Sequence, residues 1–118
     1  MKPTHRHAVG LLCAFAISSA FGHGTVVSAS PKNGATLSTP PTEIRLQFNE
    51  PLEQTFTSVK VFASSGKEVT TTEKTRVAGG NTVVQPLPVL PPGGYKAKWT
   101  TVGHDGHRVH GELVFTVK

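Results

Sequence analysis

The residue types best suited to chemistry gather in one segment, 101–111, which holds three of the six histidines and the only aspartate of this 118-residue chain. Asp105 and His107 are separated by a single glycine. In an extended or gently turned backbone, residues two apart place their side chains on the same side. A carboxylate and an imidazole that face the same way are two ligands of a metal site that needs further donors.

The further donors are predicted to come from His23, the first residue left after removal of a signal peptide. Residues 1–22 begin with basic side chains, continue with an apolar run over 8–17, and end with small residues at the spacing of a cleavage site. The run is too short to span a bilayer, which needs ~20 apolar residues. Cleavage after Gly22 gives an exported domain of residues 23–118. An uncleaved anchor and a later start site are the alternatives.

A histidine at the first position of a chain offers two donors to one metal ion. Its α-amino nitrogen and its imidazole Nδ1 close a six-membered chelate, and the amine gives up its proton to a metal readily. With the imidazole of His107 and the carboxylate of Asp105, these donors make a set of three nitrogens and one oxygen. In tetragonal geometry that set suits Cu(II), which it binds more tightly than Zn(II). Alone, His23 or the Asp105–His107 pair is also explained as ordinary polar surface, but together they predict one Cu(II) per chain.

Two further histidines lie in the same segment. His104, His107 and His110 are three residues apart, which on a helix would suggest a zinc face. The glycines of the segment and the β-branched Val109 argue against a helix. On a strand, His107 and His110 face opposite ways. His104 is a candidate accessory ligand and His110 a weaker candidate; the alternative for both is a solvated surface residue.

Other residues that could carry chemistry have simpler interpretations. Glu50 and Glu53 form an acidic pair, but Pro51 and the loop context favour a solvated turn. Tyr95 and Trp99 could stack on a sugar, but they alternate with lysines, which indicates that they face the core.

Composition excludes several classes of function. The chain has 12 Lys and Arg against 7 Asp and Glu, and the basic residues are spread without a cluster that contains aromatic side chains, so nucleic-acid binding is not predicted. The only cysteine and methionine are Cys13 and Met1, both in the predicted signal peptide. The exported domain would therefore have no disulfide and no sulfur ligand.

The remaining chain has the pattern of a single all-β domain. Short runs alternate between apolar and polar residues, as Ile44, Leu46 and Phe48 do within 43–49. Gly and Pro turns separate these runs, and no window has the period of a helix. A sandwich or small barrel of about seven strands is expected. The predicted strands cover residues 24–30, 43–49, 57–62, 67–72, 82–85, 95–101 and 109–117.

The chain resembles the CopC-like periplasmic copper-resistance proteins over nearly all of residues 23–118. Each motif is short, but the ordered combination is specific. The resemblance is carried by the starting His23 and by Ser30-Pro31-Lys32-Asn33-Gly34-Ala35, Leu46-Gln47-Phe48-Asn49-Glu50-Pro51-Leu52, Leu90-Pro91-Pro92-Gly93-Gly94-Tyr95-Lys96-Ala97-Lys98-Trp99, Asp105-Gly106-His107 and Gly111-Glu112-Leu113-Val114-Phe115-Thr116-Val117.

This resemblance implies a Greek-key β-sandwich or barrel of cupredoxin-like or immunoglobulin-like shape. It implies a Cu(II) site formed by His23, Asp105 and His107 in a soluble periplasmic protein. A monomer is expected, although the sequence does not determine the oligomeric state. An inner-membrane copper transporter of the CopD type is a candidate partner. Some members carry a methionine-rich loop that binds Cu(I), but the corresponding residues 63–84 contain no Met and no His. A Cu(II)-only type is therefore expected.

Three functions are compatible with these observations. The first is a copper-binding protein, not an enzyme, that sequesters or carries Cu(II) for resistance, homeostasis or import. The second is a copper-dependent monooxygenase, because such enzymes also use an N-terminal histidine chelate. An aspartate at a copper position, the small size and the lack of an exposed aromatic platform argue against it. The third is an adhesive β-sandwich without metal, which dialysis against Cu(II) would distinguish.

Overall fold

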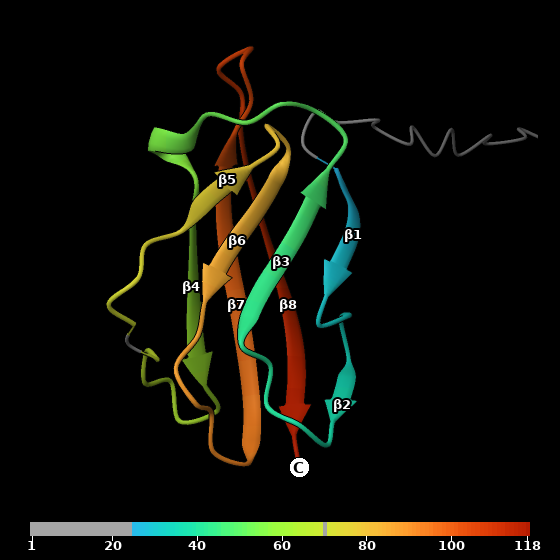
Figure 1. The fold of residues 1–118 in the computed structure, drawn as a ribbon, viewed down its shortest axis with the longest axis vertical. Helices are drawn as coiled ribbons and strands as arrows, with labels where there is room; N and C mark the ends of the chain where they lie inside the picture. Colours follow the sequence, from blue (N-terminus) through green and yellow to red (C-terminus); the bar gives the residue numbers. More distant parts are fainter. Residues whose placement is uncertain (1–24, 70) are drawn as a thin grey trace, which may run out of the picture.

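The alternating residues of this chain form eight β-strands in two facing sheets (Figure 1). The computed structural model describes residues 25–69 and 71–118. The predicted signal peptide and His23 lie outside these residues. In chain order the elements are β1 (Val26–Ser30), β2 (Ala35–Leu37), β3 (Glu43–Phe48), the 3-10 helix η1 (Gln54–Phe56), β4 (Ser58–Ala63), β5 (Arg76–Ala78), β6 (Thr82–Pro86), β7 (Gly93–Val102) and β8 (Arg108–Val117).

The chain passes repeatedly from one sheet to the other. The first sheet has the strand order β1-β3-β6-β5, and the second has the order β2-β8-β7-β4. The crossings from β3 to β4 and from β6 to β7 put consecutive strands in different layers, as in Greek-key sandwiches. The described strands pair antiparallel except β2 with β8, which is parallel. This arrangement confirms the predicted all-β fold as an immunoglobulin-like sandwich of two open sheets.

The core lies between the sheets and is filled by residues whose inward direction follows from alternation. Ile44, Leu46 and Phe48 of β3 are fully buried. From the opposite sheet, the rings of Tyr95 and Phe115 stack with centroids 5.5 Å apart. Burial of such large apolar side chains is the main favourable contribution to folding. This contribution stabilises the domain without the help of a disulfide.

The strand predictions differ from the structure at three short segments. The edge strand predicted over 67–72 was wrong, because among its described residues only Glu68 makes an isolated bridge, to Phe62. The sequence analysis missed β2 and β5, which have three residues each and show no alternation. In the described part of the chain, no helix has the length and hydropathy needed to cross a bilayer.

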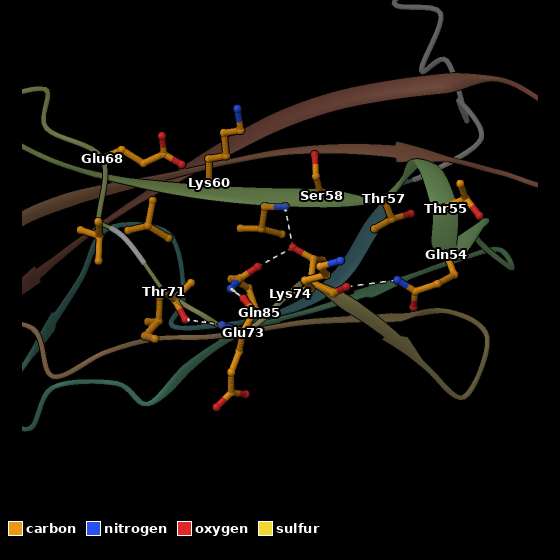
Figure 2. Close-up of a pocket in the computed structure, with 15 residues that line it drawn as sticks. Gln54, Thr55, Thr57, Ser58, Lys60, Glu68, Thr71, Glu73, Lys74 and Gln85 are labelled. Atoms are coloured by element: carbon orange, nitrogen blue, oxygen red, sulfur yellow. Dashed lines mark hydrogen bonds between the residues drawn. The ribbon is translucent and has the colours of Figure 1, made fainter.

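The connection from β4 to β5 is held against both sheets by two polar side chains (Figure 2). The buried Gln85 of β6 donates from Nε2 to the carbonyl oxygens of Glu73 at 3.1 Å and Pro86 at 2.9 Å, and its Oε1 accepts from the hydroxyl of Thr75. The Thr75 Oγ1 also accepts a hydrogen bond from the backbone N–H of Val59 at 3.1 Å. These bonds satisfy a buried amide and cover part of the exposed edge of β4.

Trp99 and Gly111 form a close cross-strand pair at the base of the β7–β8 hairpin. They are opposite each other in register, and a β-carbon on Gly111 would lie 2.3 Å from Cζ2 of Trp99. Gly111→Ala is therefore expected to lower the free energy of unfolding by about 1–3 kcal/mol, because the half-buried ring must move. Urea unfolding followed by tryptophan fluorescence measures this change.

Gly94→Ala is the matched control on the same strand pair. A β-carbon at Gly94 would lie 3.4 Å from Oγ of Ser64, which is an ordinary contact. We expect this variant to unfold at nearly the native urea concentration. Equal effects of the two substitutions would contradict the close packing of Trp99 on Gly111.

Candidate metal centre

The loop between β7 and β8 is a tight turn that projects at one end of the sandwich (Figure 1). The backbone N–H of Gly103 donates to the carbonyl of His107 at 3.2 Å, and the N–H of Gly106 donates to the carbonyl of Gly103 at 2.9 Å. Gly106 has a φ of +82°, a left-handed conformation that glycine adopts without steric cost. The turn places the polar residues of the loop at the tip of the hairpin.

Asp105 and His107 lie side by side in this loop, as their spacing predicts. The backbone N–H of His107 donates to Oδ1 of Asp105 at 3.0 Å, which orients the carboxylate toward the histidine. Nδ1 of His107 is 3.7 Å from Oδ2 of Asp105. Adjacent ligands of one ion lie about 3 Å apart, given metal–ligand bonds of ~2.0–2.2 Å. The His107 side chain is 72% exposed, so its ring can be reached from solvent.

The other two histidines of the segment lie in different surroundings. Nε2 of His104 is 3.7 Å from Oε1 of Glu53, so this imidazole faces the segment before η1. His110 faces the outer side of the second sheet, where its Nδ1 is 3.1 Å from Oγ1 of Thr100. His107 precedes the first residue of β8, so strand alternation describes only the direction of His110. A role for His104 as an accessory ligand stays a prediction.

Glu50 is a residue of this region that the sequence analysis missed. The sequence pattern predicts a solvated turn for Glu50 and Glu53, but Oε1 of Glu50 is buried beneath the hairpin loop. A β-carbon on Gly103 would lie 2.6 Å from this oxygen and 3.0 Å from Oδ1 of Asp105. The two carboxylate oxygens are therefore at most 5.6 Å apart, the sum of these distances. Carboxylates this close favour a cation beside them, because their charges repel.

Backbone pairing explains why Glu50 reaches the loop. Leu52 pairs with Gly103, and the N–H of Glu53 donates to the carbonyl of Val102 at 2.7 Å, so residues 52 and 53 lie against the start of the β7–β8 loop, two residues after Glu50. A sequence signal for this contact exists only in part. Glu50 follows the strongly alternating β3 even more closely than Asp105 follows β7, but alternation does not show that the two strand ends meet.

The start of the described chain is fixed at the same end of the molecule. Thr25 and Asn49 exchange two hydrogen bonds, from the N–H of Thr25 to Oδ1 of Asn49 and from the N–H of Asn49 to the carbonyl of Thr25, both at 3.0 Å. Asn49 directly precedes Glu50, which contacts the loop. Figure 1 shows the beginning of β1 and the end of β3 at the end that carries the β7–β8 loop.

This end of the molecule combines nitrogen and oxygen donors. Its carboxylates are those of Glu50, Glu53 and Asp105, and its imidazoles are those of His104 and His107. Among the residues that the structure describes, no three His, Cys, Asp or Glu side chains are arranged to hold one metal ion. The described residues bring together two of the predicted ligands, Asp105 and His107. The third, His23, lies outside them.

Comparisons with known proteins identify the family. The family model of the CopC domain matches residues 26–118. Copper resistance protein C of Xanthomonas campestris pv. juglandis is 32% identical over 117 residues, which cover 93% of this chain and 91% of that protein. Copper transport protein CutJ of Bacillus subtilis is 33% identical over 110 residues, which are 91% of this chain but only 20% of CutJ.

Solved structures have the same fold. CopC from Methylosinus trichosporium OB3b superposes with a TM-score of 0.76 at 28% identity, over 81% of this chain and 94% of that chain. PcoC of Escherichia coli, a methionine-rich copper resistance protein, superposes with a TM-score of 0.69 at 27% identity, over 82% of this chain and 100% of PcoC. The family model, the similar sequences and the shared sandwich together show that the chain belongs to the CopC family, whose members are copper-binding proteins and not enzymes.

Proposed function

We propose that this protein binds one Cu(II) ion in the periplasm and sequesters or carries it for copper resistance, homeostasis or import. The observation that carries the proposal is the Asp105–His107 pair, with Nδ1 and Oδ2 3.7 Å apart at an exposed hairpin tip, in a chain of the CopC family. A nitrogen and an oxygen ligand beside a second carboxylate suit Cu(II) better than Cu(I). An exposed site also suits a protein that receives and releases its ion.

The complete ligand set in this proposal adds the α-amino and imidazole nitrogens of His23. His23 is two residues before Thr25, and two residues span at most ~7 Å. Thr25 is bonded to Asn49, and the next residue, Glu50, reaches the loop that carries Asp105. Chain length and these contacts are therefore compatible with a ligand set that joins the start of the exported chain to the hairpin. Glu50 is the residue proposed to position Asp105 beside the ion.

The absence of sulfur donors supports a preference for Cu(II). The exported residues 23–118 contain no Cys and no Met. The connection from β4 to β5, within the region where some relatives carry methionines, borders a hollow of about 510 Å³. Figure 2 shows that its labelled lining consists of amide, hydroxyl, carboxylate and ammonium side chains. Soft Cu(I) prefers thiolate and thioether ligands, so this hollow is not a Cu(I) site in our proposal.

The proposed cellular location and partner are supported by the family of the chain and by its predicted export signal. The signal pattern at 1–22 supports a periplasmic location, and the matching part of CutJ belongs to a protein described as a copper transport protein. An inner-membrane transporter of the CopD type is the proposed partner, and the protein is proposed to act as a monomer without nucleic acid. The monooxygenase alternative has no support in the comparisons, because the family is not one of enzymes.

Mass spectrometry and metal competition on the exported protein test the proposal. We expect the mass of a chain that begins at His23, and under native conditions an added mass of one copper ion after exposure to Cu(II). Ascorbate with a Cu(I) chelator should then remove the copper readily, because reduction leaves Cu(I) on amine, imidazole and carboxylate donors that it binds weakly. Without reductant, the same chelator should remove little.

Two results would contradict this proposal. Retention of Cu(I) as tight as that of Cu(II) would show that donors other than the proposed set hold the ion. A protein that takes up no Cu(II) in equilibrium dialysis would leave only an interaction domain without metal. An Asp105→Ala/His107→Ala variant is the control for copper bound elsewhere on the surface.

A further inference from the structure

The outer face of the second sheet carries an unusual arrangement of like charges. On the strands β4, β7 and β8, alternate residues point away from the core and lie in cross-strand rows. One row joins Lys60 to Lys98, and Lys98 in turn is opposite Glu112. Like charges directly opposite each other on neighbouring strands destabilise a sheet. The opposite charge of Glu112 offsets this cost at Lys98, whereas Lys60 has only Lys98 opposite it in the described register.

The positive charge of this face is only partly compensated. Lys96 forms an ion pair with Glu112 at 3.8 Å, with both side chains largely exposed. Nζ of Lys98 lies 5.5 Å from the centre of the Phe62 ring, a cation–π contact that leaves the charge in place. Among the described residues, no carboxylate is within ion-pair distance of Lys60 or Lys98. The face thus presents two ammonium groups that form no ion pair, on residues directly opposite each other in register.

Two hollows flank the contact between Phe62 and Lys98. One, of about 480 Å³, is lined by Lys60, by the carboxylate of Glu112 and by the polar groups of Ser58, Thr100 and His110. The other, of about 580 Å³, is bordered by Lys96 and the exposed Val114. Phe62 and Lys98 line both hollows. The face therefore combines cations, hydrogen-bonding groups and apolar surface within a few strand positions.

We propose that this outer face of β4, β7 and β8 is a docking surface for a partner protein that presents carboxylate side chains. Complementary charge would remove the repulsion between Lys60 and Lys98. Hydroxyl and imidazole groups in the first hollow would accept or donate hydrogen bonds to an acidic segment. The second hollow would take an apolar side chain of the same partner, because Phe62 and Val114 offer contact area there.

The face fits a protein better than a membrane or a nucleic acid. Phe62 lies partly buried beneath Lys98. A side chain that anchors a protein in lipid instead projects from the surface and buries its apolar part among the acyl chains. Three lysines on a flat sheet do not form the long basic stripe that follows a phosphate backbone. The proposal is independent of the copper ligands, because none of the residues in this docking surface belongs to the proposed metal site.

An acidic peptide tests the docking surface directly. The probe is N-acetylated hexaglutamate, titrated into the isotopically labelled exported protein while backbone amide resonances are followed by NMR. We expect the largest shifts on β4, β7 and β8, and an affinity that falls as NaCl is raised. Lys60→Glu/Lys98→Glu should weaken binding by roughly tenfold or more, because two charged contacts become repulsive.

Matched controls distinguish binding to this face from attraction by the net positive charge of the whole protein. Lys32→Glu/Lys67→Glu makes the same change in net charge at exposed positions outside the face, and should weaken binding much less. Lys60→Gln/Lys98→Gln repeats the test without introduced acidic groups, and thermal unfolding verifies that each variant is folded. Cu(II) binding should be unchanged in all of them, so failure here is distinguishable from failure of the proposed function.

Three outcomes would overturn the proposal. The first is equal weakening by the two charge-reversal variants. The second is a set of peptide-induced shifts that maps outside β4, β7 and β8. The third is binding to phosphatidylglycerol vesicles through these lysines without any measurable binding of hexaglutamate, which would make the face a lipid-binding surface.

Discussion

Addition of one residue before His23 in the exported chain is expected to weaken Cu(II) binding by more than ~100-fold. Loss of a residue that only hydrogen-bonds to a metal ligand typically weakens metal binding by ~10–100-fold, and this change removes a ligand itself. The extension converts the α-amine of His23 into an amide and so breaks the proposed chelate. His107→Ala should have a comparable effect, since it removes an imidazole ligand. Asp105→Ala should weaken binding less and change the Cu(II) EPR spectrum. Competition against a chelator of known affinity measures each change.

His110→Ala is the matched control for this experiment. It removes an imidazole from the same hairpin, but one that faces the outer side of the sheet beside Thr100. We expect native Cu(II) affinity for this variant. An extended protein that binds Cu(II) as tightly as the natural one would exclude the N-terminal chelate, and the Asp105–His107 pair would then need other partners.

Phe48→Ala is expected to lower the free energy of unfolding by about 3–5 kcal/mol. The Phe48 ring is fully buried at the end of β3, where its removal leaves a cavity between the two sheets. Domains of this size are stable by only about 5–15 kcal/mol, so this one substitution would remove a large share of the stability. Chemical denaturation of the exported protein, with and without Cu(II), measures it.

Phe56→Ala controls for the loss of an aromatic side chain as such. Phe56 lies in η1 and is 56% exposed, so its removal should change the stability by no more than about 0.5 kcal/mol. A similar loss for both variants would mean that burial in the sandwich is not what makes Phe48 important. The contrast tests the assignment of the core independently of the metal site.

Local sequence patterns are enough to predict much of this molecule. The alternation of Ile44, Leu46 and Phe48 gives the direction of each side chain, because the pleat of a strand has a period of two wherever it is placed. The spacing of two residues also predicts that Asp105 and His107 lie together, and in the structure Nδ1 of His107 is 3.7 Å from Oδ2 of Asp105. The proposals that involve residues 1–23 remain predictions from sequence.

Pairing partners and register come only from the tertiary structure. The strands β2 and β5 have three residues each, too few to show a period, and they exist because longer neighbours supply their hydrogen bonds. Glu50 has the local pattern of a solvated turn, yet it lies beneath Gly103 because the following Leu52 and Glu53 pair with Gly103 and Val102. Lys60 and Lys98 are directly opposite only through the register of β4 and β7. Periodicity shows which way a side chain points along its own strand, whereas contacts between distant strands depend on how the two sheets pack.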